Sequence, residues 1–279
     1  MPVVSQLPLT GATLAQPLDF AQAGLPSLDA VRESIIFTPV PGGATYQLLR
    51  TVEFDAYESS PATAAVSQLL QQQGLASPEA IAAALRASRR PPSENFAGTA
   101  RAAAKLSVGS GPTQQFGDMS ALINSLPADS AMIHHVPPID TGSGSARVSE
   151  EQRNVHVVAF LYAASREADN DFHLIVGRDP AATPEMYMTM EISGLPPAGS
   201  PAFQSLKRAR DAFQSFFGAH LPQFSYDYYH PPIPVVIEGS LFFDMTHAVG
   251  QAPGPPSLKS RMPTIWEVHP VTSIVLGKP

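Results

Sequence analysis

The sequence predicts an α+β, mainly β protein whose C-terminal half forms an OB-like five-stranded barrel. Two observations predict this fold. Five β-prone runs follow one another between residues 153 and 276, and one amphipathic helix separates the third run from the fourth. Their order, β-β-β-α-β-β, is that of an OB-like barrel. The same elements also fit an α+β sandwich, which is the alternative architecture.

The five runs and the helix each have a pattern typical of the expected element. The first run is continuously β-prone and long enough for a strand buried on both faces, whereas the fourth alternates apolar and polar residues. Apolar residues recur at helical spacing from Phe203 to Phe217, with Ser200 as the expected N-cap and Gly218 after the last turn. The expected strands are Arg153–Ala163, Phe172–Gly177, Met186–Ile192, Pro234–Asp244 and Thr264–Leu276.

The N-terminal half is expected to contain an arm, a hairpin and helices. Residues 1–30 are rich in Pro, Ala and Gln without a sustained period, which indicates an extended arm. Two β-prone runs, Ser34–Val40 and Tyr46–Tyr57, surround a Pro-Gly-Gly turn and predict a β-hairpin. We therefore divide the chain into an arm over 1–30, a hairpin and helical region over 31–146, and the barrel domain over 147–279.

Helices are expected in the middle of the N-terminal region. Ala, Gln and Leu are abundant from residue 61 to 105, and Ser77-Pro78-Glu79 supplies an N-cap followed by a first-turn proline. One more helical turn fits residues 118–126. The segments 107–118 and 127–146 are rich in turn-forming residues, and we expect them to be loops.

Charge and cysteine content exclude several classes of protein. Lys and Arg number 17 against 24 Asp and Glu, the net charge is −7, and both halves of the chain are acidic. Nucleic-acid binding is therefore disfavoured, since duplex-binding proteins normally carry a positive field. The absence of cysteine excludes disulfides, thiolate-ligated zinc and thiol catalysis. We also expect a soluble protein with no signal peptide and no transmembrane segment, because no apolar run of about 18 residues occurs. The compartment stays open.

Histidines and carboxylates on the expected barrel strands are candidate site residues. Alternation places His173 on the face of its strand opposite Phe172, and Glu191 on the polar face of the third strand. On the last strand Glu267 and His269 share a face. If these faces converge, the residues supply ligands for a divalent metal or an acid/base pair. Their spacing matches no metal motif, and the polar face of any half-exposed sheet has the same appearance.

Two features near the fourth strand could also contribute to a site. Asp244 and His247 stand at the start of a Gly/Pro-rich loop over 245–263, and loops after strand ends often carry functional residues. The simpler interpretation is a turn carboxylate beside a solvated histidine. The aromatic residues between Phe224 and His230 either stack on a ligand at the mouth of the barrel or cover its end.

Five segments of the C-terminal half, with one earlier strand, carry a resemblance to a known family. The segments are Glu151–Val155, Asp169–Gly177, Glu191–Pro196, Gly239–Asp244 with His247, and Trp266–Thr272, and the earlier strand is Tyr46–Tyr57. Together they resemble an uncharacterised bacterial protein family with no established activity. The resemblance marks the segments around His173, Asp244 and His269 as characteristic of that family. It supplies no catalytic residue.

Two functions fit these observations. The first is a soluble binding or structural module that holds a small polar molecule, a glycan or a protein on the face of its second and third strands. Its expected ligand-binding residues are His173, Tyr187, Glu191 and His247. The acidic charge and the missing metal motif favour this module.

The alternative is a metal-assisted, phosphodiesterase-like hydrolase whose cofactor is a divalent metal. Its candidate metal ligands and acid/base groups are His173, Asp244, His247 and His269. The two functions differ in one geometric expectation. The hydrolase requires the three histidines to lie close to one another, whereas the module allows their polar faces to point apart.

Overall fold

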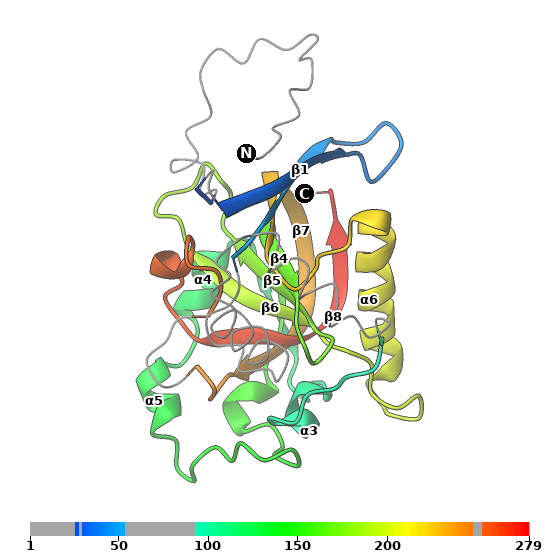
Figure 1. Ribbon diagram of the computed structural model, residues 1–279. Helices are drawn as coiled ribbons and strands as arrows, with labels where there is room; N and C mark the ends of the chain where they lie inside the picture. Colours follow the sequence, from blue (N-terminus) through cyan, green and yellow to red (C-terminus); the bar gives the residue numbers. More distant parts are fainter. Residues whose placement is uncertain (1–25, 28–29, 54–92, 248–252, 279) are drawn as a thin grey trace, which may run out of the picture.

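The computed structural model describes residues 26–27, 30–53, 93–247 and 253–278, and its strands join in one eight-stranded sheet (Figure 1). The chain is mainly β, with few helices, as predicted. The strands are β1 Val31–Phe37, β2 Tyr46–Thr51, β3 Thr113–Phe116, β4 Asn154–Arg166, β5 Phe172–Gly177, β6 Tyr187–Ile192, β7 Asp227–Phe243 and β8 Trp266–Leu276. The α-helices are α3 Ala102–Lys105, α4 Met119–Asn124, α5 Asp129–Ile133 and α6 Phe203–Phe217, with 3-10 turns at Ser149–Gln152, Gly218–His220 and Lys259–Arg261.

The strands follow the order β1-β2-β7-β8-β6-β5-β4-β3, and β7 also pairs with β4. The pairs β6–β8 and β3–β4 are parallel, and the other pairs are antiparallel. β7 reaches several partners because it is long. One edge pairs with β4, and the other pairs first with β2 and then with β8. The element order from β4 to β8, with α6 between β6 and β7, agrees with the predicted β-β-β-α-β-β sequence.

The main hydrophobic core lies on one face of these strands. Leu174 of β5, Met190 of β6, Leu241 of β7 and Val268 of β8 are all fully buried in it. Burial of each such side chain contributes about 1.5–3 kcal/mol to folding. Because successive residues of a strand point to opposite faces, the neighbours of these residues in the sequence point away from the core. The core therefore determines which face carries the ionisable residues.

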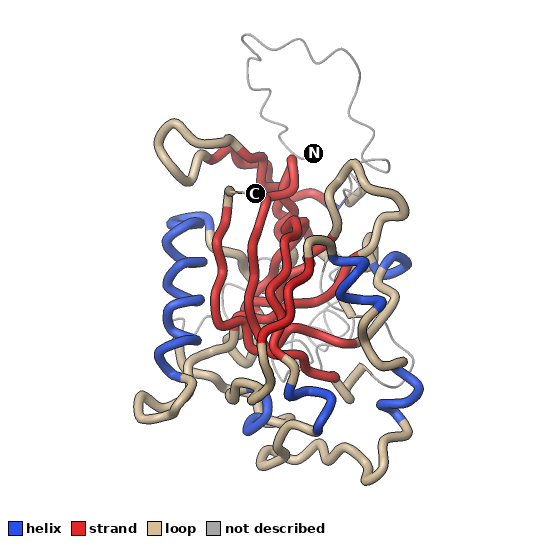
Figure 2. Tube along the Cα trace, turned by 180° about the vertical axis from the view of Figure 1, so that it is seen from behind, coloured by secondary structure: helices blue, strands red, loops and turns tan. Residues whose placement is uncertain are grey.

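Helix α6 covers the core beside β8 and β6. Its apolar side includes Phe213 and Phe217, both buried in the main core. The helix ends at Gly218, whose positive φ of 53° favours glycine. The N-cap is Ala202 and not the predicted Ser200, and it makes no side-chain cap. Figure 2 shows α6 along one side of the strands and the shorter helices around the other parts of the sheet.

The N-terminal hairpin is present, and it belongs to the same sheet as the C-terminal strands. β1 and β2 are antiparallel, and β2 continues the sheet by pairing with β7. A short strand, β3, and helix α5 occupy segments that were expected to be loops. β3 has no apolar alternation, and its place depends on backbone pairing with the edge of β4. The helices predicted over residues 61–92 lie outside the described residues.

In the part of the chain that the structure describes, no helix combines the length and the apolar character needed to cross a bilayer.

Candidate metal centre

A cluster of carboxylates and imidazoles lies on the face of β5, β6 and β8 that points away from the main core. Strand register explains why residues distant in the sequence meet here. His173 of β5 is directly opposite Glu191 of β6, and β6 pairs in parallel with β8 at Thr189 and Glu267. We call this set the ionisable cluster, and it consists of Glu167, Asp171, His173, Glu191, Asp244, His247, Glu267 and His269.

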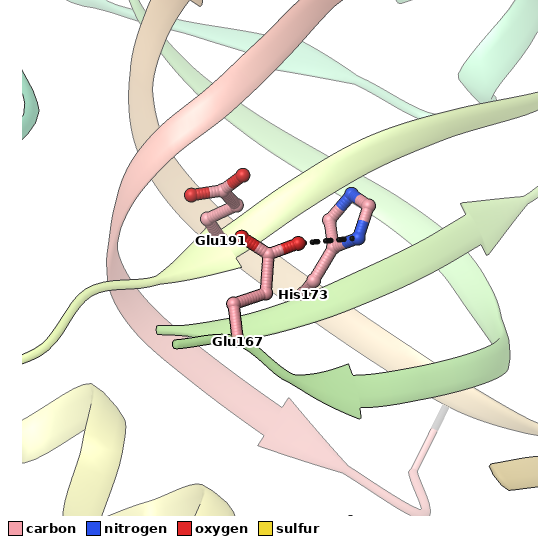
Figure 3. Close-up of side chains that lie close together, drawn as sticks. All are labelled: Glu167, His173 and Glu191. Carbon is pink, nitrogen blue, oxygen red and sulfur yellow. Dashed lines mark ion pairs between the residues drawn. The ribbon is translucent and has the colours of Figure 1, made fainter. Parts of the chain in front are cut away.

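The ionisable cluster contains three sets of potential metal ligands. Within each set, one ligand atom from each residue lies within 4.8 Å of the others. Figure 3 shows the first set, in which Glu167 and His173 form an ion pair and Glu191 projects from the neighbouring strand. The sets are Glu167, His173 and Glu191; Asp171, Glu191 and His269; and Asp244, His247 and Glu267. Each of the three histidines singled out from the sequence therefore belongs to one set.

His269 connects the sets. Its Nδ1 lies 2.6 Å from Oε2 of Glu191 and 3.8 Å from Oε2 of Glu267. Its Nε2 lies 3.4 Å from Oδ2 of Asp171. All four side chains are at most 3% exposed. Each ring nitrogen of His269 therefore faces a buried carboxylate.

Several polar atoms of this cluster make no hydrogen bond within the described part of the chain. Even the close approach of His269 to Glu191 lies outside hydrogen-bond geometry. Leaving such an atom buried costs about 1–3 kcal/mol, more when it is charged. A cation would give these oxygens and nitrogens a partner. The atoms are Oδ2 of Asp171, Nε2 of His173, Oε2 of Glu191, both carboxylate oxygens of Glu267 and both ring nitrogens of His269.

Burial, reinforced by repulsion between carboxylates, dominates the electrostatics of the ionisable cluster. Burial, together with Asp169 and Glu191, raises the pKa of Asp171 well above its usual range. Burial, Glu191 and Asp244 do the same to the pKa of Glu267. Burial also lowers the pKa of the His269 imidazole, which favours the neutral form that binds metals.

Lys105, from α3, supplies a positive charge next to these carboxylates. Its Nζ lies 3.9 Å from Oε2 of Glu191, and its side chain is buried. Burial alone would raise the pKa of Glu191, but His269 and Lys105 hold that pKa well below its usual range. Burial opposes the charge on Lys105, yet Glu191 and Asp244 raise the pKa of Lys105 well above its usual range. Glu191 is thus ionised and attracts cations.

A buried tyrosine orients His173. The Tyr226 hydroxyl hydrogen-bonds Nδ1 of His173 at 2.7 Å, and Oε1 of Glu167 lies 3.0 Å from the same nitrogen. Tyr226, Tyr228 and Tyr229 are at most 1% exposed. The burial of these three tyrosines contradicts stacking on a ligand at an exposed mouth and agrees with the other alternative, a covering role. β7 begins at Asp227 and not near residue 234. Tyr228 and Tyr229 therefore lie within this strand and are buried in the sheet.

Tyr187, a sequence candidate, and His156 of β4 both lie outside the ionisable cluster. Tyr187 shares a face with Glu191, but it packs edge-on against Tyr162, with ring centroids 4.8 Å apart, and donates to Glu185. His156 lies on the surface, where its Nδ1 is 2.9 Å from Glu238. Tyr187 thus belongs to an apolar cluster, and His156 belongs to a surface ion pair.

Sequence reasoning missed Asp171, Glu167 and Lys105 as members of the site. Asp171 stands two positions before His173, just outside the expected strand Phe172–Gly177. Extending the strand alternation backwards by one step would have found it. Lys105 comes from a four-residue helix more than 60 residues before β5, and no local pattern relates it to the cluster.

Arg147 and Gly239 hold β7 and β8 together beside the ligands. Arg147 donates to the carbonyls of Leu241, at 2.6 Å, and His269, at 2.5 Å, and so joins β7 to β8 beside the cluster. Gly239 lies so close to β8 that an added Cβ would come 2.5 Å from the Pro270 carbonyl oxygen. Both features hold the His269 backbone against β7.

Comparison of the chain with family models, curated proteins and solved structures gave no match. The interpretation of the site therefore depends on its own geometry.

Proposed function

We propose that this protein is a divalent-metal-binding module built on an OB-like barrel. The strand pairs β4–β5, β5–β6, β6–β8, β8–β7 and β7–β4, with α6 between the third and fourth strands of this series, support the barrel assignment. The metal lies on the face of the second and third of these strands. This proposal combines the binding module favoured by the sequence with the divalent metal that the sequence analysis expected only for the hydrolase.

The observation that carries the proposal is the position of His269 between two buried carboxylates. Glu191 lies at one ring nitrogen and Asp171 at the other, and each side chain has a buried atom without a hydrogen bond in the described part of the chain. A purely structural network is expected to satisfy its buried polar atoms. In a metal site, by contrast, the ligand atoms point at the ion and need no hydrogen-bond partner within the protein.

The ligand types favour a borderline transition metal. Imidazole nitrogen suits zinc and neighbouring metals, whereas carboxylate oxygen suits manganese, magnesium and calcium. A site that combines the two, in a chain without cysteine, fits Zn²⁺ or Mn²⁺ better than the all-oxygen site of Ca²⁺.

The test is direct metal binding by the full chain. Protein purified in a chelator and then desalted is titrated with Zn²⁺ or Mn²⁺ by calorimetry, with Ca²⁺ as the comparison. We expect a saturable heat and a rise in unfolding temperature with wild type, and a clear reduction of both in His269→Ala. His156→Ala is the matched control, because it removes a surface imidazole that also faces a glutamate. Absence of saturable binding to any of the three ions by wild type would contradict the proposal.

Metal-assisted hydrolysis is a second candidate function, and the environment of His173 favours it. Tyr226 and Glu167 orient one ring nitrogen, and the other, Nε2, has no hydrogen bond in the described residues. Such an imidazole suits the role of general base beside a metal, which lowers the pKa of a bound water. The assay is turnover of bis(p-nitrophenyl) phosphate and p-nitrophenyl acetate by the metal-loaded protein. A His173→Ala variant that binds metal but loses turnover supports this role, whereas no turnover by wild type leaves the binding module alone.

A further inference from the structure

We infer that the ionisable cluster holds two divalent cations, one at Asp171, Glu191 and His269 and one at Asp244, His247 and Glu267. This inference rests on the proposed metal-binding function and specifies its stoichiometry. Its starting point is that these two ligand sets share no residue, although each is compact to within 4.8 Å. A single ion cannot be coordinated by all six residues, because the side chains of two separate sets would have to move together around it.

The second set has a buried carboxylate that no hydrogen bond explains. Both oxygens of Glu267 are buried, the side chain is fully inaccessible, and neither oxygen makes a hydrogen bond within the described residues. The strand fixes Glu267 in this position, because its neighbours Trp266 and Val268 are anchored in the main core. An ion beside Glu267 would satisfy both oxygens.

Asp244 presents one oxygen to the same place. Its Oδ1 accepts the backbone N–H and the hydroxyl of Thr246, at 2.7 and 2.6 Å, and is thereby committed to the turn. Its Oδ2 lies 3.8 Å from Nε2 of His247. The turn that follows β7 thus orients an oxygen and an imidazole towards Glu267.

The charge of the ionisable cluster agrees with two ions. Its three ligand sets contain five carboxylates, and Lys105 is a neighbouring cation. One divalent ion together with Lys105 balances three of the five negative charges. Two divalent ions together with Lys105 balance all five. Uncompensated buried charge is strongly unfavourable, so once metal has displaced the protons and all five carboxylates are ionised, this count favours the second cation.

The two positions are adjacent. Glu267 and His269 stand two residues apart on β8, and Oε2 of Glu267 lies 3.8 Å from Nδ1 of His269. Ligand atoms this close belong to ions that are near neighbours. Ions in two-metal sites typically lie about 3.5–4 Å apart. The proposed arrangement is therefore a paired centre and not two independent sites.

The experiment is a stoichiometry measurement on the full chain. Metal-free protein is loaded with Mn²⁺, desalted, and analysed by native mass spectrometry and elemental analysis. We expect two ions per chain in wild type, one in Asp244→Asn and one in Asp171→Asn. Glu238→Gln, which neutralises a surface carboxylate that faces an imidazole, is the control and is expected to retain two.

The outcomes separate this inference from the proposed function. No bound ion in wild type would contradict both. One ion in wild type would overturn the paired centre and leave the proposed function standing, and two ions that persist in Asp244→Asn would also overturn it. Electron paramagnetic resonance of the Mn²⁺-loaded wild type needs no variant. We expect the broadened spectrum of two coupled ions, and a six-line spectrum of isolated ions would overturn the inference.

Discussion

Nδ1 of His269 lies 2.6 Å from Oε2 of Glu191, across the parallel pair formed by β8 and β6. This contact joins two strands separated in the sequence by α6 and β7, and it lies on the side of the sheet opposite the main core. Main-core residues on both strands hold the two side chains in this position: Met190 and Ile192 flank Glu191, and Val268 precedes His269. The ionisable cluster is thus positioned by the same strands that stabilise the fold.

The substitution Glu267→Gln tests whether Glu267 belongs to a metal site or to a structural hydrogen-bond network, because the two predict opposite changes in stability. The metal-free variant should be more stable than wild type, on the order of 1 kcal/mol, because Gln requires neither the burial of a charge nor the uptake of a proton beside Glu191 and Asp244. Stabilisation by added metal should be reduced but not lost, since the ligand set Asp171, Glu191 and His269 is intact. Urea unfolding with and without chelator measures both effects. A large loss of stability in chelator would show that Glu267 has a structural partner, and Glu238→Gln controls for the loss of one surface charge.

The close approach of β7 to β8 predicts a strong effect of Gly239→Ala. An added Cβ would come 2.5 Å from the Pro270 carbonyl oxygen and from a methyl group of Val268, so the β8 backbone must move. We expect a loss of about 1–3 kcal/mol in unfolding free energy, with weaker metal binding because His269 adjoins Pro270. Gly199→Ala is the matched control, since its Cβ meets open space. Equal stabilities of the two variants would contradict the prediction.

The sequence allowed some parts of the fold to be predicted because local patterns determine them. β5 begins and ends at the predicted residues, since a turn precedes it and its apolar residues are continuous. Alternation correctly placed His173, Glu191 and His269 on faces opposite core residues. β7 was predicted to begin at Pro234, whereas it begins at Asp227 and includes Pro231 and Pro232. The strand continues through them, since the β4–β7 register is irregular opposite these prolines.

The convergence of the site could not be predicted from the sequence. It depends on the parallel pairing of β6 with β8, which brings Glu191 to His269 over 78 residues of chain, and such pairing leaves no local signal. The contribution of Lys105 is likewise a tertiary contact. The sequence indicates the polar face of each strand, whereas only the structure shows that these faces meet at one place.

Metal affinity should increase with pH. In the metal-free protein, the raised pKa values of Asp171 and Glu267 mean that these carboxyls hold protons at pH values where an ordinary carboxylate is ionised. A divalent ion must displace those protons, so binding releases protons and strengthens as pH rises through the raised pKa values. Calorimetry in two buffers with different protonation enthalpies counts the protons released. An affinity that is constant between about pH 6 and about pH 8 would count against this linkage.

Lys105 is a competing cation, and its replacement should therefore have opposite effects on the empty and the loaded protein. In Lys105→Met the metal-free protein loses the ammonium near Glu191 and should be destabilised by roughly 3 kcal/mol, as when one partner of a buried pair is removed. Metal binding should tighten by about tenfold, which corresponds to about 1.4 kcal/mol, because the ammonium no longer repels the ion.

Thermal unfolding in chelator measures the first effect of Lys105→Met, and calorimetric titration with Mn²⁺ measures the second. Lys207→Met is the control, since the pair that this lysine forms with Asp211 on α6 is exposed. A role for Lys105 in stability alone predicts destabilisation with unchanged affinity. Weaker binding in Lys105→Met would contradict the competing role of Lys105, since removing a positive charge beside a cation should raise its affinity while the fold is retained.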